Sequence, residues 1–201
     1  MEKLDLEFYG RPNVVRIAKE LLGKVLTTTI NGTTTSGRIV ETEAYNGVTD
    51  RASHAWAGRR TPRNEIMYIS SGTAYVYVCY GIHHLFNVVT NANEIPNCVL
   101  VRAVEPLIGI ETMLRRSSKQ KLDRTLTSGP GNVSRALGIK VLDSGTDLMG
   151  NKVFIADDGF SVKPNMIVAG ARIGVESAGE HALLPYRFFV RDNIYVSGRR
   201  H

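Results

Sequence analysis

The chain has 201 residues, which suits one domain with a hydrophobic core or at most two small ones. A composition of 43% hydrophobic and 22% charged residues excludes a largely disordered chain, and the apolar runs are too short to span a bilayer. The net charge of +6 favours a polyanionic partner such as nucleic acid, although charge alone is a weak indication. The N-terminal MEKLDLEFYG lacks the apolar run of a signal peptide, so we expect a cytoplasmic protein.

A helix and a β-hairpin are the first predicted elements. Residues 13–22 place apolar side chains at helical spacing, and Gly23 suits the end of that helix. The runs 25–30 and 37–45 have the pattern of strands, and the Asn31-Gly32 pair between them is a hairpin turn signal.

Strands dominate the rest of the chain. Residues 73–90 predict a second hairpin, whose strands meet near Gly81. The further predicted elements are a buried strand at 98–104, a helix at 105–116, a loop entering a short helix at 128–138, and strands at 152–156, 166–175 and 186–191. Because strands outnumber helices and most connections are hairpins, the pattern predicts an α+β fold with a single mixed domain around a largely antiparallel sheet.

The stretch VETEAYNGVTDRASHA, residues 40–55, carries an unusual number of reactive side chains. Strand alternation puts positions 39, 41, 43 and 45 on one side, so Glu41, Glu43 and Tyr45 share a face. One carboxylate in a cleft would serve as a general base that takes a proton from water. Alternatively, both glutamates face solvent on a half-exposed strand, and the pattern alone favours this second interpretation.

The hairpin at 73–90 contains three tyrosines. Tyr75 and Tyr77 share a face, while Tyr80 lies at or near the tip. Aromatic residues in strands usually pack in a core, but a tip aromatic on a basic protein could stack on bases or enter a duplex. The adjacent His83 and His84 point to opposite faces of a strand, so we predict no metal site there.

Two basic features each allow two interpretations. The loop GRRTPRN, 58–64, is either a solvated surface loop or a set of phosphate contacts. Arg102 lies in the apolar segment CVLVRAVEP and needs a partner, which is either a structural carboxylate or an active-site carboxylate.

The two cysteines have no zinc-site spacing, and the motifs GxSxG, GxGxxG, HExxH and the P-loop are absent, which argues against the common enzyme classes that carry them.

Seven segments occur in an order that resembles a known family. They are GRIVETEAYNG, HAWAGRRTPRN, GTAYVYVCYGIHHLFNVV, CVLVRAVEPLIGIETM, SGPGN, ARIGVESAGE and PYRFFV. Together they resemble the alkyladenine (3-methyladenine) DNA glycosylases, the monofunctional purine-specific type, over residues 8–197. The resemblance implies a bacterial-type base-excision repair enzyme, one domain at 1–201, with a curved antiparallel sheet, flanking helices and a protruding DNA-inserting β-hairpin.

The implied activity is the flipping of alkylated or deaminated purines out of duplex DNA and hydrolysis of the N-glycosidic bond, which leaves an abasic site. The implied lesions are 3-methyladenine, 7-methylguanine, hypoxanthine and ethenoadenine. The resemblance makes Glu43 the base that activates water, and gives Arg102 and the backbone carbonyl of Val175 the task of holding that water. Tyr45 and Tyr77 would sandwich the flipped base, His54 would contact it or a phosphate, and Asn87 would discourage guanine.

The resemblance also implies a set of DNA contacts. Tyr80 matches a wedge in the minor groove, with Ile82 and His83 beside it and with Arg59 and Arg63 as phosphate contacts. The expected partner is double-stranded DNA with damaged purines, bound by a monomer in the cytoplasm at the nucleoid, with no membrane, cofactor or metal. No lysine stands in a nucleophile position, so we expect no strand cleavage.

One position departs from the family pattern. After SGPG the family often has lysine, and here Asn132 follows. A cationic contact to phosphate is then lacking, and Arg63 or the basic cluster at 115–124 would have to replace it.

Two other functions fit parts of the sequence. A non-catalytic nucleic-acid-binding module on the same fold would need neither Glu43 nor Arg102, and both are present. A hydrolase of free nucleosides would not need a wedge such as Tyr80.

Overall fold

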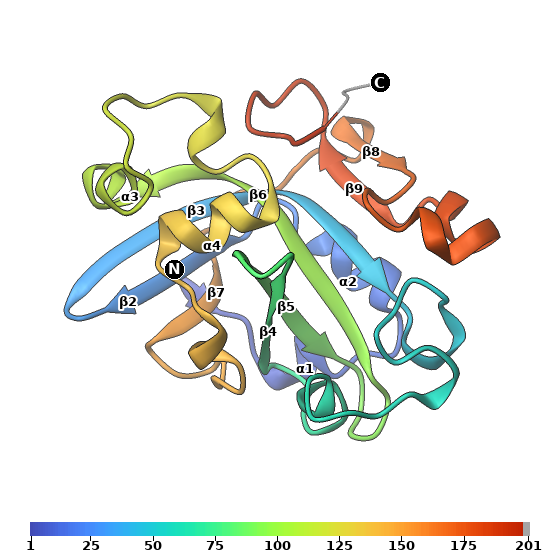
Figure 1. Cartoon of the computed structure of the whole chain (residues 1–201). Coiled ribbons are helices and arrows are strands. Elements are labelled where there is room, and N and C mark those ends of the chain that lie inside the picture. The colour runs from blue at the N-terminus through green and yellow to red at the C-terminus, as the bar shows by residue number, and fades with distance from the viewer. Residues whose placement is uncertain (199–201) are drawn as a thin grey trace.

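Nine strands form one antiparallel sheet in the computed structural model, which describes residues 1–198 (Figure 1). The strands are β1 (Glu2–Lys3), β2 (Val25–Ile30), β3 (Thr33–Tyr45), β4 (Ala74–Cys79), β5 (His83–Thr90), β6 (Asn97–Ile108), β7 (Val153–Asp157), β8 (Ile167–Gly170) and β9 (Arg187–Val190). Their order is β1-β7-β2-β3-β6-β5-β4, and β9 pairs with both β3 and β8. The predicted α+β class and antiparallel sheet are confirmed.

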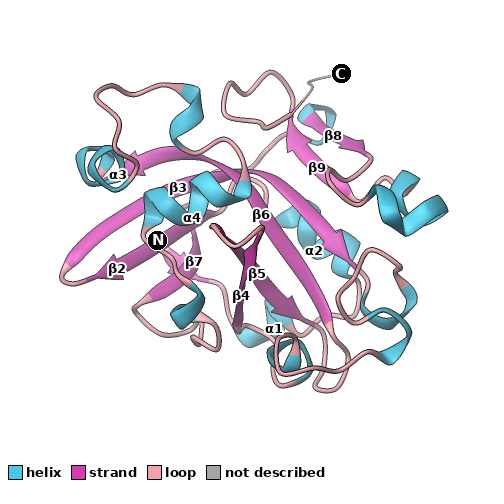
Figure 2. Ribbon diagram, viewed as in Figure 1, coloured by secondary structure: helices cyan, strands magenta, loops and turns pink. Residues whose placement is uncertain are grey.

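The helices are short and lie around this sheet (Figure 2). They are α1 (Leu6–Tyr9), α2 (Val14–Glu20), α3 (Ile110–Arg116) and α4 (Pro130–Leu137). Short 3-10 turns occur at Gly47–Thr49, Trp56–Gly58, Glu65–Tyr68, Arg124–Leu126, Val141–Asp143, Pro164–Met166 and Glu176–Leu183. Of the helices in residues 1–198, none combines the length and apolar character that a membrane span requires.

Both predicted hairpins are present. In the first, Asn31 and Gly32 have φ values of 51° and 73°, the positive pair that a two-residue turn of type I′ needs. Its second strand, β3, starts at Thr33 rather than at 37, because β2 pairs with it from the turn onward.

The stretch that begins at Glu105 is predicted as helix but forms strand. Arg38 and Gly37 of the long strand β3 pair with Glu105 and Pro106, so ladder hydrogen bonds extend β6 to Ile108, and the helix begins only at Ile110. The strand predicted at 166–175 ends at Gly170, where its pairing with β9 ends. Tertiary pairing, which local pattern does not report, decides both boundaries.

Two register shifts interrupt β3 around Glu41. They lie between Ile39 and Glu41 and between Glu41 and Thr42, opposite β6. Bulges of this kind re-aim side chains. The expectation that position 39 shares a face with 43 and 45 is therefore wrong: Ile39 joins the main core together with Ala44.

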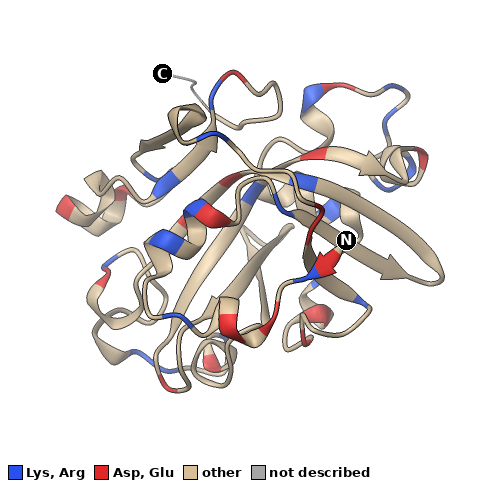
Figure 3. Cartoon of the chain, turned by 180° about the vertical axis from the view of Figure 1, so that it is seen from behind, with Lys and Arg blue, Asp and Glu red and all other residues tan. Residues whose placement is uncertain are grey.

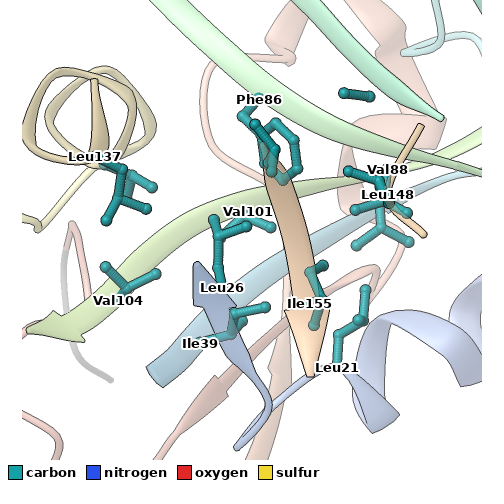
Figure 4. Packing of buried hydrophobic residues seen from close by; sticks show 14 of the residues in the cluster. Leu21, Leu26, Ile39, Phe86, Val88, Val101, Val104, Leu137, Leu148 and Ile155 are labelled. Atoms are coloured by element: carbon teal, nitrogen blue, oxygen red, sulfur yellow. The ribbon is translucent and has the colours of Figure 1, made fainter. Parts of the chain in front are cut away.

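The main core fills the space between the sheet, α2 and α4. Leu137 of α4 and Leu21, which follows α2, join side chains from the strands, among them Leu26, Ile39, Phe86 and Val101 (Figure 4). A second, smaller cluster is rich in tyrosine and contains Tyr45, Tyr68, Tyr75 and, partly buried, Tyr77. This second cluster borders the polar side chains described next.

Candidate active site

Glu43 lies near the end of β3 with a fully buried side chain. Its Oε1 accepts a hydrogen bond from the backbone N–H of Ile173 at 2.8 Å and lies 3.2 Å from Nη1 of Arg102. Its Oε2 accepts from the hydroxyl of Tyr45 at 2.8 Å. A carboxylate offers about four acceptor positions, and Glu43 accepts one hydrogen bond on each oxygen, with the guanidinium of Arg102 beside Oε1, so Oε2 keeps a free acceptor position.

Arg102 links Glu43 to the neighbouring Glu41. Its Nε donates to Oε1 of Glu41 at 3.1 Å, while its Nη1 is the atom close to Glu43. Burial lowers the pKa of Arg102 and the charges of Glu43 and Glu41 raise it, with a net rise above the usual value. The guanidinium thus stays cationic between two carboxylates.

Glu41 accepts four hydrogen bonds, twice as many as Glu43. Its Oε1 accepts from Nε of Arg102, from Nε of Arg187 at 2.6 Å and from Oγ of Ser197 at 3.0 Å. Its Oε2 accepts from the backbone N–H of Ser197 at 2.6 Å. Both glutamates are buried, so the interpretation of a solvent-facing strand is wrong for this part of β3.

A row of paired residues leads from Glu43 across the sheet. Glu43 pairs with Leu100, Leu100 with Asn87, and Asn87 with Tyr75. Residues directly opposite in an antiparallel sheet share a face, so these side chains border one surface. Tyr77, two residues after Tyr75, lies on the same face, with the two ring centroids 5.4 Å apart.

His54 packs against these tyrosines from the following loop. Its Nδ1 lies 2.7 Å from the hydroxyl of Tyr75, and its ring centroid is 4.6 Å from that of Tyr77. Burial, and then the charges of Arg63 and Arg59, lower the pKa of His54 to about 4. The imidazole is therefore neutral at neutral pH.

Asn87 and Val175 lie at this surface with groups already engaged. The amide nitrogen of Asn87 donates to the carbonyls of Tyr75 at 3.1 Å and Leu85 at 3.3 Å. Val175 packs against the tyrosine-rich cluster, and its carbonyl accepts from the N–H of Ala178 at 2.9 Å. A carbonyl oxygen has two lone pairs, so one acceptor position remains on Val175.

Sequence reasoning missed three groups in the surroundings of Glu43, which are Arg172, its partner Asp50 and the backbone N–H of Ile173. The side chain of Arg172 is fully buried, pairs with Asp50 at 2.8 Å between Nη2 and Oδ1, and lies 4.8 Å from the ring centroid of Tyr45. A charged residue in the segment ARIGV was the available signal for Arg172. The third group, the N–H of Ile173, is a backbone donor and leaves no mark in the sequence.

The tip of the hairpin β4–β5 extends into solvent. Tyr80 is 89% exposed with φ of 50°, and Gly81 follows with φ of 74°. The N–H of Ile82 donates to the carbonyl of Cys79 and closes the turn, and Ile82 is 69% exposed. A positive φ is strained for a tyrosine, and the exposed ring makes no compensating contribution to core packing. The core interpretation of the hairpin therefore holds for Tyr75 and fails for Tyr80.

His83 and the basic loop flank this hairpin. His83 lies against Gly131 of α4, so closely that a Cβ there would come within 2.8 Å of its Nδ1. Arg63 lies 4.9 Å from the ring centroid of Tyr77 and donates to the carbonyl of Val78, while Arg59 is exposed. Arg60 pairs instead with two carboxylates. Along the ribbon, Lys and Arg alternate with Asp and Glu rather than gathering in one element (Figure 3).

Within residues 1–198 no group of three or more His, Cys, Asp or Glu side chains could hold a metal ion. The chemistry that the arrangement offers is that of a buried carboxylate with a spare acceptor position, next to a guanidinium and an aromatic surface.

Comparisons with known proteins show the family of this chain. A family model described as methylpurine-DNA glycosylase matches residues 7–194. A protein of Desulfitobacterium hafniense (strain Y51) is 44% identical over 98% of this chain and 99% of its own length, and one of Clostridium perfringens (strain 13 / Type A) is 40% identical over 97% and 98%. A third, from Chlamydia pneumoniae, is 44% identical over 93% and 94%. All three carry the name "Putative 3-methyladenine DNA glycosylase". The chain belongs to the methylpurine-DNA glycosylase family.

Proposed function

We propose that this chain, as one domain over 1–201 and as a monomer, excises alkylated or deaminated purines from duplex DNA in the bacterial nucleoid. The proposed substrates are 3-methyladenine, 7-methylguanine, hypoxanthine and ethenoadenine. The observation that carries the proposal is the carboxylate of Glu43, which is buried beside Arg102 and the tyrosine-rich cluster and keeps one acceptor position.

The proposed reaction is a hydrolysis of the N-glycosidic bond. As the bond between the base nitrogen and C1′ breaks, its electron pair leaves with the base and positive charge develops on the sugar. The carboxylate of Glu43 stabilises that charge and takes a proton from the attacking water, whose oxygen forms the new bond to C1′. A 3-methyladenine already carries a positive charge, so it departs as a neutral base without protonation.

Arg102 and Val175 complete the proposed water site. The guanidinium of Arg102, beside Glu43, polarises the water. The water gives one proton to Glu43, and its second O–H donates a hydrogen bond to the free lone pair of the Val175 carbonyl. The link from Arg102 to Glu41 keeps part of the guanidinium charge away from Glu43.

The base would lie against Tyr45 and Tyr77. Their faces favour a cationic alkylated purine through cation–π attraction. The neutral His54 supplies a ring nitrogen rather than a second positive charge, which suits contact with such a cation. Asn87 borders the same face and would oppose the exocyclic amino group of guanine.

The exposed tip is assigned to DNA distortion. Tyr80 would enter the minor groove and fill the space of the flipped nucleotide, with Ile82 and His83 against the neighbouring bases. Arg59 and Arg63 would contact phosphates on the side of the base pocket.

The test is a labelled duplex that contains one hypoxanthine, ethenoadenine or 3-methyladenine. We expect strand breaks after alkali treatment for at least one lesion and no breaks without alkali, because no lysine nucleophile is assigned. Binding of the duplexes without any alkali-labile site would favour a non-catalytic binding module instead.

Replacement of the tip residue tests base flipping separately. Tyr80→Ala should weaken the quenching of ethenoadenine fluorescence that accompanies binding, because unstacking costs a few kcal/mol and the wedge offsets it. Tyr9→Phe is the control, since Tyr9 is buried in the main core and its hydroxyl has no hydrogen-bond partner among residues 1–198. Unchanged quenching in Tyr80→Ala would contradict the wedge.

A further inference from the structure

A pocket of about 510 Å³ lies beside the hairpin tip and is not part of the site above. Its wall includes Ile82 of the tip and His84 of β5, together with residues of α4 and of the turn between β2 and β3. Its size is within the range of ligand sites in proteins.

This pocket faces the side of the hairpin that is turned away from the tyrosines. Tyr77 pairs with Leu85, and Val78 pairs with His84. Successive residues of a strand point to opposite faces, so His84 lies on the face opposite to Tyr77. Ile82 borders the pocket two residues after Tyr80. The tip thus has the candidate active site on one side and this pocket on the other.

The pocket wall carries positive charge without compensation. Arg116, Arg135 and Lys140 line it, and no Asp or Glu does. Within residues 1–198 these three cations form no ion pair. Burial, and then the neighbouring Arg115, lower the pKa of Arg116, as expected where no carboxylate is near. Ser134, also in the wall, has a buried Oγ without a hydrogen-bond partner.

One of these cations is held in place. Nη1 of Arg116 donates to Oγ1 of Thr35 at 3.1 Å and to the carbonyl of Ala136 at 3.2 Å. A guanidinium has five N–H donors, so most of them stay available for an anion. Arg135 and Lys140 are exposed at the rim. A fixed guanidinium with two mobile cations suits a phosphodiester, which accepts several charge-assisted hydrogen bonds.

Asn132 does not supply such a contact. It is neutral, and its Nδ2 donates to the carbonyl of Ser128 at 2.9 Å, at the start of α4. The amide is engaged in holding the loop that enters the helix.

We propose that this pocket binds backbone phosphates of the DNA strand that passes the hairpin on the side away from the base, and that Arg116, Arg135 and Lys140 replace the cation that Asn132 lacks. The proposal rests on the proposed insertion of Tyr80 into a duplex. A duplex entered at its minor groove has backbone on both sides of the inserted tip. The wall of the pocket reaches the tip through Ile82, so such a backbone passes it within a few nucleotides of the step that Tyr80 occupies.

The test compares two double variants that remove the same charge. Arg135→Gln with Lys140→Gln changes the two rim cations, and Lys163→Gln with Arg191→Gln changes two exposed cations that are remote from the pocket. Binding of an undamaged duplex is measured by fluorescence anisotropy at several salt concentrations. The slope of log K against log salt falls by about one for each lost phosphate contact, so we expect the rim variant to lose about two in slope and roughly tenfold in affinity at ~0.1 M salt. Equal slopes in the two variants would overturn the proposal.

Neutral methylphosphonates locate the contact. Substituted one phosphate at a time on each side of the lesion, they should weaken the wild type at one or two positions and weaken the rim variant less there, because that variant keeps only Arg116. Inorganic phosphate is the competing ligand: displacement of the duplex by phosphate beyond the effect of ionic strength, with no sensitive methylphosphonate position, would mean a site for free anion and contradict the proposal.

Excision separates this inference from the proposed function. In single turnover with saturating protein, the control variant Lys163→Gln with Arg191→Gln should excise at the wild-type rate, because neither residue lies in the pocket or in the candidate active site. Failure of the wild type to excise any lesion would refute the proposed function, while the slopes on undamaged DNA would still decide the phosphate pocket.

Discussion

Glu41 and Glu43 lie two residues apart on β3, are equally buried, and differ in what their carboxylates can still accept. Two arginines, the backbone N–H of Ser197 and its hydroxyl together donate four hydrogen bonds to Glu41. Glu43 shares only Arg102, and its other donors are one peptide N–H and one phenol. Among buried acids, the position suited to chemistry is the one whose hydrogen bonds are incomplete. The following variants should separate the two.

The largest effect is expected at Glu43. Glu43→Gln keeps the shape of the side chain but removes the proton acceptor, and a positioned general base typically contributes 10²–10⁴ in rate. We expect single-turnover excision to fall by about 10³, or about 4 kcal/mol in barrier, with lesion binding retained. Excision at the wild-type rate would show that another group activates the water.

The expected effect at Glu41 is on stability. Glu41→Gln leaves two buried guanidiniums short of a carboxylate, and breaking such pairs costs about 3–5 kcal/mol. Urea unfolding should show a lower midpoint with an unchanged slope. The control is Glu20→Gln, whose partly exposed pairs with Arg11 and Arg16 are worth at most about 1 kcal/mol. A loss at Glu41 no larger than in the control would contradict its structural role.

A smaller effect is expected for the phenol beside Glu43. Burial, and then the charge of Glu43, raise the pKa of Tyr45 well above its usual value, so the hydroxyl stays protonated and donates. Tyr45→Phe removes this hydrogen bond to a charged group, which is worth about 1.5–3 kcal/mol. We expect excision to fall about tenfold with the base surface intact.

A buried tyrosine elsewhere provides the comparison for Tyr45→Phe. The hydroxyl of Tyr9 is buried in the main core and has no hydrogen-bond partner among residues 1–198. Tyr9→Phe should leave excision unchanged. Equal rates in the two variants would mean that the Tyr45 hydroxyl has no part in the reaction.

The smallest effect is expected at His54 and depends on pH. Its folded pKa of about 4 lies below the ordinary histidine value of 6.5, so above pH 6.5 the imidazole is neutral in both the folded and the unfolded chain. Between pH 6.5 and 4 the unfolded chain takes up a proton that the folded chain does not. Stability therefore falls with falling pH, by at most about 1.4 kcal/mol per pH unit. Urea unfolding at pH 7, 6 and 5 should show a flatter dependence for His54→Gln; parallel curves would contradict the assignment.

Local signals predicted the elements that local chemistry determines. The Asn31-Gly32 turn, the hairpin around Gly81 and the short helix after SGPG all appear in the structure. The end of β6 and the start of α3 were wrong because partners on β3 decide them. The phase of β3 before Glu41 was also wrong, because two register shifts interrupt the alternation that a sequence pattern assumes.

The candidate site was only partly accessible from the sequence. The resemblance singled out Glu43 and Arg102, and the structure brings them within 3.2 Å of each other. It did not indicate that Arg102 also holds Glu41, nor that Arg172 lies over Tyr45. These two contacts join residues 61 and 127 positions apart, and no local pattern encodes them.

The bonds from Ser197 to Glu41 close a loop of 156 residues. During synthesis, β3 leaves the ribosome long before Ser197 does, so a nascent chain holds Glu41 with at most half of its four donors. Contacts of such separation form late, since the intervening loop must first be ordered. The orientation of Arg102, and with it the surroundings of Glu43, is thus completed only after Ser197 has been made and has left the ribosome.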